Sequence, residues 1–265
     1  MFSSKARTML ASLFLALSTF GAVSQASVLD EIDERGVLRV AVPQDFPPFG
    51  SVGTDMQPKG YDIDVARYIA DAMGVELELT PVTSANRIPY LETGRVDLVI
   101  SSMGKTPERE EAIDFSIAYA PFFLGVFGLE ELPVSSAADL DDQTVGTTRG
   151  AIEDLELTEV APDSTTIRRF EDNNATISAF LSGQVDLIAT GNLVAASIID
   201  RNPNRAPETK FLLQDSPCHV GIPQGDERLQ AAVNEIIAEG ISSGDFDELS
   251  EQWFGQPLPD SLKDA

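Results

Sequence analysis

The residues best suited to chemistry lie between positions 84 and 109, where a buried strand is followed by the start of a helix. Thr106 is a favourable N-cap, Pro107 fits the first helical position, and Arg109 falls in the first turn. Free backbone N–H groups, hydroxyls and a guanidinium would therefore lie together at the C-terminal edge of the strand. Such a group suits a small carboxylate. A capped helix with a solvated arginine would show the same residues, so the local pattern leaves both alternatives open.

A short internal repeat indicates how the chain positions these residues. The sequence LETGRVDLV at 91–99 returns as FLSGQVDLI at 180–188. Each copy has the pattern of a helix end, a glycine stop and a buried strand, in that order. Two copies favour two similar α/β lobes over a solenoid, which needs more and shorter repeats. Because a glycine before a strand is common, chance similarity is the alternative.

The remaining segments alternate between strands and helices, which predicts open α/β sheets with ligands at the carboxyl ends of the strands. Strands are expected at 37–42, 75–80, 122–127 and 220–223, a strand with its following loop at 145–150, and helices at 61–73, from 151 onward and at 227–240. Crossings of the chain near 122 and 220 would leave a cleft between two lobes. The predicted limits are 27–122 with 220–265 for the first lobe and 123–219 for the second.

The first 26 residues have the pattern of a cleavable signal peptide. Lys5 and Arg7 precede the mostly apolar positions 9–21, and small residues follow at 24 and 26. The apolar run is too short for a membrane span, and no later segment approaches one. The mature protein is therefore expected to be a soluble periplasmic monomer.

Charge and cysteine content restrict the possible partners. The chain has 43 acidic residues against 18 basic ones, a net charge of −25. This charge disfavours binding to nucleic acid and to anionic membranes. Cys218 is the single cysteine, so no intrachain disulfide can form and the fold needs its own hydrophobic core. No residue spacing suggests a zinc or calcium site, and no cofactor is predicted.

Four segments, in order along the chain, resemble one protein family. GYDIDVA at 60–66, the block at 84–109, DFS at 114–116 and QWFG at 252–255 are similar to the polar amino-acid-binding proteins of ABC importers. The resemblance spans almost the whole mature chain. It implies a two-lobed periplasmic binding protein of type II, with an open α/β sheet in each lobe and a two-strand hinge. Such a protein closes on its ligand by a hinge motion and delivers it to an ABC permease.

Within this family, the pattern TSxNRIPxL at 83–91 resembles the glutamate- and aspartate-binding branch. The resemblance implies that Ser84 and Arg87 contact the ligand, Arg87 at the side-chain carboxylate, and that Arg109 holds the α-carboxylate. It also implies contacts from the end of the strand and from the loop at 149–152, and Phe46 is a candidate stacking wall. The complete set of predicted ligand-binding residues is Phe46, Ser84, Arg87, Ser102, Met103, Gly104, Thr106, Arg109, Arg149, Gly150, Ala151, Ile152, Thr190 and Asn192.

Two positions depart from the family pattern. The second-lobe aspartate that pairs with a ligand α-ammonium aligns with Gly191, and a second acidic position aligns with Pro43. In the acidic branch, that second position carries a ligand-contacting arginine, which proline also does not replace. A buried ammonium without a carboxylate partner is costly. Either Asp45 or Glu153 substitutes, or the ligand is not an ordinary α-amino acid.

The sequence thus predicts a non-catalytic binding protein for a small carboxylate-bearing solute, an amino acid or a related organic acid. The alternative is a periplasmic enzyme on the same fold, similar to cyclohexadienyl dehydratase. It would need a general acid or base, for which Asp45, Glu153 and His219 are the candidates. His219 follows Cys218, but adjacent residues on a strand face opposite sides, which disfavours a thiol–imidazole pair. A sensor or receptor ligand-binding domain is a third interpretation, disfavoured because the sequence shows neither a membrane-spanning segment nor a signalling domain.

Overall fold

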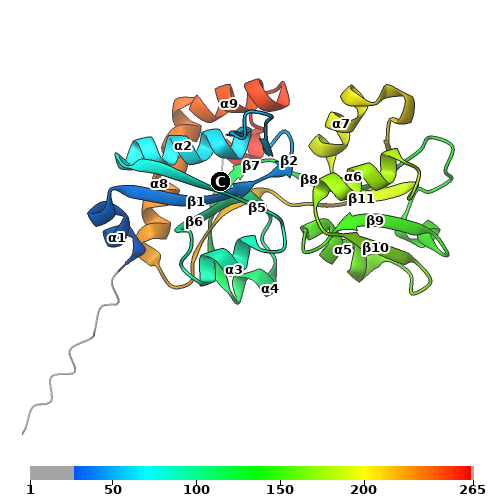
Figure 1. The fold of residues 1–265 in the computed structure, drawn as a ribbon, viewed down its shortest axis with the longest axis horizontal. Helices are drawn as coiled ribbons and strands as arrows, with labels where there is room; N and C mark the ends of the chain where they lie inside the picture. Colours follow the sequence, from blue (N-terminus) through cyan, green and yellow to red (C-terminus); the bar gives the residue numbers. More distant parts are fainter. Residues whose placement is uncertain (1–26, 264–265) are drawn as a thin grey trace, which may run out of the picture.

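Two five-stranded sheets organise the chain, one in each of two α/β lobes that lie side by side (Figure 1). The computed structural model describes residues 27–263, so the signal peptide predicted at 1–26 lies outside the described residues. The strand order is β5-β1-β6-β13-β7 in the first lobe and β10-β9-β11-β8-β12 in the second. The prediction of an open α/β sheet in each lobe is confirmed.

The first lobe combines segments from both ends of the chain. Its sheet contains β1 (Val37–Pro43), β5 (Glu76–Val82), β6 (Leu98–Met103), β7 (Ile113–Ala120) and β13 (Cys218–Pro223). Its helices are α1 (Val28–Arg35), α2 (Tyr61–Met73), α3 (Arg87–Glu92), α4 (Pro107–Glu110), α8 (Glu227–Ser243), α9 (Asp245–Phe254) and α10 (Asp260–Lys263), and a small sheet contains β2 (Asp45–Phe46), β3 (Gly50–Val52) and β4 (Pro58–Lys59). Strands β5, β1 and β6 are parallel, whereas β13 runs antiparallel to both β6 and β7.

The second lobe repeats this arrangement. Its sheet contains β8 (Phe123–Gly128), β9 (Thr144–Thr148), β10 (Thr166–Phe170), β11 (Leu187–Gly191) and β12 (Glu208–Asp215). Its helices are α5 (Ile152–Val160), α6 (Asn173–Leu181) and α7 (Asn192–Arg201), with short 3-10 turns at Ala137–Leu140 and Pro203–Arg205. Strands β10, β9 and β11 are parallel, and β8 runs antiparallel to β11 and β12. The repeated sequence pattern therefore falls on equivalent elements, α3–β6 and α6–β11.

The chain crosses between the lobes twice, after β7 and after β12. The backbone N–H of Ser216 donates to the carbonyl oxygen of Phe122 at 2.8 Å, so the two crossing segments lie side by side. The second crossing lies at 216–217 rather than near 220, because β13 begins at Cys218. Cys218 and His219 pair with β7 of the first sheet, although the predicted limits assigned them to the second lobe.

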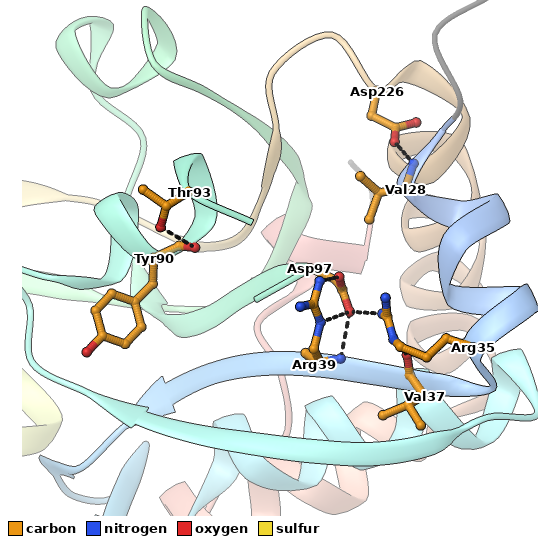
Figure 2. A network of polar contacts seen from close by, with 8 residues as sticks. All are labelled: Val28, Arg35, Val37, Arg39, Tyr90, Thr93, Asp97 and Asp226. Carbon is orange, nitrogen blue, oxygen red and sulfur yellow. Dashed lines mark hydrogen bonds and ion pairs between the residues drawn. The ribbon is translucent and has the colours of Figure 1, made fainter. Parts of the chain in front are cut away.

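A buried carboxylate ties the repeat of the first lobe to the start of the sheet (Figure 2). One oxygen of Asp97 accepts hydrogen bonds from Nη2 of Arg35 at 2.6 Å and from the backbone N–H of Arg39 at 2.8 Å. The other carboxylate oxygen forms an ion pair with Nη2 of Arg39 at 2.5 Å. Because Asp97 is fully buried, these partners offset a desolvation cost that would otherwise be large.

An aromatic cluster links the core of the first lobe to the hinge. The Phe122 ring lies 5.5 Å from the Phe49 ring and 5.9 Å from the Phe46 ring, measured between centroids. All three side chains are at most 5% exposed. The hinge is therefore packed against apolar groups on its first-lobe side. None of the helices within 27–263 is long and apolar enough to cross a membrane.

Candidate ligand-binding site

Arg109 joins the two lobes. It lies in the first turn of α4, which Thr106 caps by accepting the backbone N–H of Arg109 at 3.2 Å, as predicted. The side chain is only 5% exposed. Its Nη1 donates to the carbonyl oxygen of Gly104 at 2.7 Å, and its Nη2 donates to that of Gly150 in the second lobe at 3.2 Å. The guanidinium is thus held by carbonyl groups from both sides of the inter-lobe contact.

Arg87, at the start of α3, is a second buried cation in the first lobe. It is 4% exposed, and its Nη1 donates to the carbonyl oxygen of Ser101. Its Nε is buried without a hydrogen-bond partner among the residues of 27–263. The Arg87 side chain is therefore buried and does not lie on a solvated helix face.

Both guanidiniums lack an anionic partner within the described part of the chain. Neither Arg87 nor Arg109 forms an ion pair there with a carboxylate within 4.0 Å. Burial lowers the pKa of Arg87, and burial together with the neighbouring charge of Arg87 lowers the pKa of Arg109 to about 9. Two buried cations without carboxylates have the electrostatic character of an anion-binding site.

Helix α5 brings an acidic side chain from the second lobe toward the two arginines. Glu153 is 3% exposed, and its Oε1 has no hydrogen-bond partner in the described structure. Burial raises its pKa to about 7, while the charges of Arg87 and Arg109 act in the opposite direction. The sequence suggested Glu153 only as a substitute acid and did not include it among the ligand-binding residues. The available signal was its position in the first turn of the helix that begins directly after the loop at 149–152.

A second buried carboxyl shapes the loop after β6. Asp62, at the start of α2, accepts the backbone N–H of Ser102 at 2.7 Å and the hydroxyl of Tyr119 at 2.8 Å. Ser102 has a φ of 41°, a conformation that residues with side chains adopt with strain. The hydrogen bond to Asp62 therefore supports the turn that leads to Arg109. Burial raises the pKa of Asp62 to about 7. No local pattern indicated this supporting role, although Asp62 lies in the family-like segment.

Asp45 forms a direct contact between the lobes. Its carboxylate oxygens accept the side-chain amide of Asn173 at 3.3 Å and the backbone N–H of Asn174 at 3.0 Å. These donors lie at the N-terminus of α6, where free N–H groups and the helix dipole favour a negative charge. Asp45 is therefore engaged with the second lobe.

Two glycines lie where the backbone closely approaches other side chains. A Cβ at position 191 would lie 2.2 Å from a ring carbon of Phe122. A Cβ at position 104 would lie 2.1 Å from Ser216 Oγ and 2.7 Å from Ile152 Cδ1. Gly191 thus has a steric reason to lack the acidic side chain of the family pattern, and Gly104 permits close contact between the lobes.

The structure buries some of the predicted ligand-binding residues and leaves others outside the group around the arginines. Phe46, Arg87, Ser102, Met103, Gly104, Arg109, Ala151, Ile152 and Thr190 are buried, and Ser84, Thr106, Gly150 and Asn192 are half-buried. Arg149 has a side chain that is 54% exposed and lies 3.8 Å from Glu171. Asn192 accepts the backbone N–H of Phe123 at 3.3 Å and lines a surface pocket beside the hinge. Ligand contacts from any of these residues remain predictions.

Cys218 and His219, the candidate thiol–imidazole pair, are both part of the packed first sheet. His219 Nδ1 lies 2.8 Å from the carbonyl oxygen of Ser116, and Cys218 is fully buried. Burial raises the pKa of the Cys218 thiol well above its ordinary value, which disfavours the thiolate. Over residues 27–263, no group of three histidine, cysteine or acidic side chains is placed to hold a metal ion.

Two lobes, a two-segment hinge and buried charges at the inter-lobe contact are features of the class of two-lobed solute-binding proteins. The sequence matches the bacterial extracellular solute-binding proteins, family 3, over residues 38–256, and the chain belongs to this family. It is 28% identical over 232 residues to the L-cystine-binding protein TcyJ of Escherichia coli K12, with 86% of each chain covered. It is 29% identical over 235 residues to the glutamine-binding protein GlnH of Bacillus subtilis, with 87% of this chain and 85% of the relative covered.

Solved structures show the same fold. An ancestral amino-acid-binding protein, described as a precursor of cyclohexadienyl dehydratase, is similar with a TM-score of 0.79 and 33% identity, over 86% of this chain and 100% of that one. The cysteine-binding protein of Campylobacter jejuni is similar with a TM-score of 0.81 and 25% identity, over 86% and 93% of the two chains. The predicted type II periplasmic binding fold and the resemblance to amino-acid-binding proteins of ABC transporters are both confirmed. The resemblance to a glutamate- and aspartate-binding branch stays a prediction.

Proposed function

We propose that this protein captures a small solute with a carboxylate, an α-amino acid, between its lobes and delivers it to an ABC permease in the inner membrane. The observation that carries the proposal is the pair of buried guanidiniums, Arg87 and Arg109, without a carboxylate partner in the described part of the chain. A ligand carboxylate supplies the missing anion, and charge-assisted arginine–carboxylate bonds are among the stronger hydrogen bonds of proteins. Relatives named for binding cystine, glutamine and arginine support an α-carboxylate as the shared feature.

Arg109 has the geometry to couple binding to closure. Its guanidinium already reaches the carbonyl oxygens of Gly104 and Gly150, which belong to different lobes. A carboxylate held by the remaining N–H groups would be enclosed as the lobes close. Exclusion of water then strengthens the interaction, because the local dielectric constant falls.

Arg87 extends the proposal to acidic amino acids. Its Nε is buried and has no hydrogen-bond partner within 27–263, and the sequence pattern around it resembles the acidic branch. A second carboxylate on the ligand would pair with this group. We therefore expect glutamate, aspartate or a similar dicarboxylate to bind better than a neutral amino acid of the same size.

The cellular setting follows from the N-terminal pattern and from the family. A signal peptide at 1–26 and membership of a family of extracellular solute-binding proteins support a periplasmic location for the mature chain. The protein acts there as a monomer, and its strongly acidic composition keeps nucleic acid from being a partner.

The proposal is tested by isothermal titration calorimetry of the mature chain with the twenty amino acids and small dicarboxylates. Arg109→Ala should weaken the best ligand by about 100-fold or more, because breaking a buried charge pair costs roughly 3–5 kcal/mol. Arg228→Ala is the matched control, since its side chain is 61% exposed and it is not among the predicted ligand-binding residues. It should change the affinity by less than about threefold. Retained affinity in Arg109→Ala would place the site elsewhere.

A dehydratase of prephenate-like acids is the second candidate, and one observation favours it. Glu153 is buried beside two cations, and burial raises its pKa to about 7, which suits a general acid near neutral pH. The similar ancestral structure is itself an amino-acid-binding protein, described as a precursor of cyclohexadienyl dehydratase, so this likeness is compatible with either function. Incubation with prephenate distinguishes the two functions. Consumption that is lost in Glu153→Gln would support the enzyme, whereas binding without consumption would support transport.

A further inference from the structure

We infer that Glu153 binds the α-ammonium of the ligand and makes the site specific for α-amino acids over the same acids without the amino group. The inference rests on the proposed function and deepens it, because it assigns a partner to the second charged group of the ligand. In this arrangement the first lobe supplies the cations and the second lobe supplies the acid.

Position 191 is closed to an acidic side chain. A Cβ there would lie 2.2 and 2.3 Å from two ring carbons of Phe122. That ring is 1% exposed and packs against the Phe46 and Phe49 rings. Its backbone is held by the hydrogen bond from Ser216. Because an acid at position 191 would have to displace this buried ring, another element is better placed to supply the acid of the family pattern.

The other buried acids already have partners. Five acidic side chains are buried within 27–263, namely Asp45, Asp62, Asp97, Glu153 and Asp154. Asp45 is bound to the start of α6, Asp62 to a backbone N–H and a tyrosine hydroxyl, and Asp97 to two arginines. Asp154 pairs with Arg169 at 2.7 Å. Glu153 alone among these five has a buried oxygen without a hydrogen bond.

Glu153 is also placed among the right charges. Its carboxyl interacts electrostatically with both Arg87 and Arg109, yet it forms no ion pair with either within 4.0 Å in the described structure. An α-amino acid carries its carboxylate and ammonium on one carbon, so their partners must lie close together without neutralising each other. Two guanidiniums and a separate carboxyl meet that requirement.

Because Glu153 is buried, its ionised form is favourable only when a ligand supplies a partner for the carboxylate. An ionised carboxylate with a buried oxygen that accepts no hydrogen bond is costly in a dry environment, and its position in the first turn of α5 offsets only part of that cost. An ammonium group would supply three donors and the opposite charge. A ligand without the amino group would instead leave Glu153 buried and unpaired, or protonated. The site should therefore discriminate strongly between the two kinds of ligand.

The test uses pairs of ligands that differ only in the amino group. L-glutamate is paired with glutarate, L-glutamine with 4-carbamoylbutanoate, and L-arginine with 5-guanidinopentanoate, each titrated by calorimetry into the mature chain. For the pair that binds best, the wild type should prefer the amino acid by about 100-fold or more. Glu153→Gln should lower amino-acid affinity by about 30-fold or more and change the affinity of the analogue by less than about threefold.

Two variants control the interpretation. Glu159→Gln makes the same change at an exposed position of α5 and should leave both affinities unchanged. Glu153→Asp keeps the charge on a shorter side chain and should retain part of the preference for the amino acid. It also provides a measurement if Glu153→Gln folds poorly.

Several results would overturn the inference. Equal losses for both ligands in Glu153→Gln and Glu153→Asp would make Glu153 a structural residue, and unchanged affinities would place the ammonium partner elsewhere. The inference would also be overturned if the wild type bound the analogue, or prephenate, more tightly than the amino acid. Failure of the proposed function looks different. In that case Arg109→Ala would retain binding, or the wild type would bind none of the carboxylates.

Discussion

The two lobes share a strand order but differ in the segments that come after their central strands (Figure 1). In the first lobe, β6 carries the strained Ser102 near its end and leads through a short loop to α4, which carries Arg109. In the second lobe, the equivalent strand β11 passes at Gly191 directly into α7. The common fold fixes where the strand ends lie, whereas the few residues after each strand determine the chemistry.

The repeated aspartate shows the same divergence. Asp97 is fully buried and pairs with Arg35 and Arg39 (Figure 2). Asp186, in the equivalent position of the second copy, pairs with Arg205 at 2.7 Å but has a side chain that is 58% exposed. Similar residues in a similar pattern therefore contribute differently, because water screens the second pair and not the first.

The largest expected effect separates these two aspartates. Asp97→Asn should lower the free energy of unfolding by about 3–5 kcal/mol, because it leaves buried donors without a charged partner. Asp186→Asn should change the free energy of unfolding by about 0–1 kcal/mol. Urea unfolding of both variants measures the difference. Equal effects would mean that the two copies of the repeat are energetically equivalent.

The second prediction concerns the cationic side of the inter-lobe contact. Arg87→Met keeps apolar volume and removes a buried guanidinium, so affinity for L-glutamate should fall at least tenfold, roughly 1.4 kcal/mol, more than affinity for L-glutamine. The same change should raise the melting temperature of the ligand-free protein, because an unpaired buried charge is removed. Calorimetry and thermal unfolding measure the two quantities. Equal losses for both ligands would exclude a role for Arg87 at a second carboxylate.

The third prediction concerns the contact between the second lobe and the hinge. Gly191→Ala should lower the free energy of unfolding by about 1–3 kcal/mol, because the new methyl group overlaps the Phe122 ring. In a double-mutant cycle, Phe122→Leu should remove much of this penalty, since the smaller side chain vacates the space. Urea unfolding gives the coupling energy. Additive effects would show that the ring can move away without cost.

The last prediction is a pH dependence of binding, which is spread gradually over two pH units. Burial raises the pKa of Glu153 to about 7, so the carboxyl must lose a proton before it can pair with an ammonium. Amino-acid affinity should therefore rise as the pH increases from about 5 to about 7, by at most tenfold, about 1.4 kcal/mol, per unit, and level off above that range. The charged and titratable groups that face Glu153 are Arg87, Arg109, Asp154 and the Cys218 thiol.

Two controls isolate this titration. Glu153→Gln should flatten the profile for the amino acid, and the deaminated analogue should show no rise in affinity with pH. A slope that survives in Glu153→Gln would assign the titration to Asp62, whose pKa burial also raises to about 7.

Much of the fold was predictable because its signals are local. Apolar periodicity and a glycine stop predict a helix at 61–73, which is the observed Tyr61–Met73, and the predicted strand at 37–42 differs by one residue from Val37–Pro43. The second crossing was predicted a few residues too late, because β13 already begins at Cys218. Pro217, immediately before it, is a break signal that marks the crossing. Element types follow from neighbouring residues, whereas the path between lobes depends on which sheet accepts a strand.

The site was predictable only in part. Thr106 and Arg109 followed from capping chemistry, and both occupy their expected positions. The opposite surroundings of Arg149 and Glu153, one exposed and one buried, depend on how α5 packs against the first lobe. Local sequence patterns do not predict that packing, because the packing brings together residues that are far apart along the chain.

The Phe122 ring also restricts how this protein can change its ligand over successive substitutions. An acid at position 191 requires a smaller residue at 122 first, since the reverse order places a Cβ 2.2 Å from the ring. A smaller residue at 122 leaves a cavity beside Phe46 and Phe49, which lowers stability. Either substitution alone, at 191 or at 122, is therefore expected to lower stability. Selection against unstable intermediates disfavours this route to the double substitution. Position 153 offers the shorter path to a new ligand class, because a single substitution there alters the charge of the inter-lobe contact without disturbing the hinge.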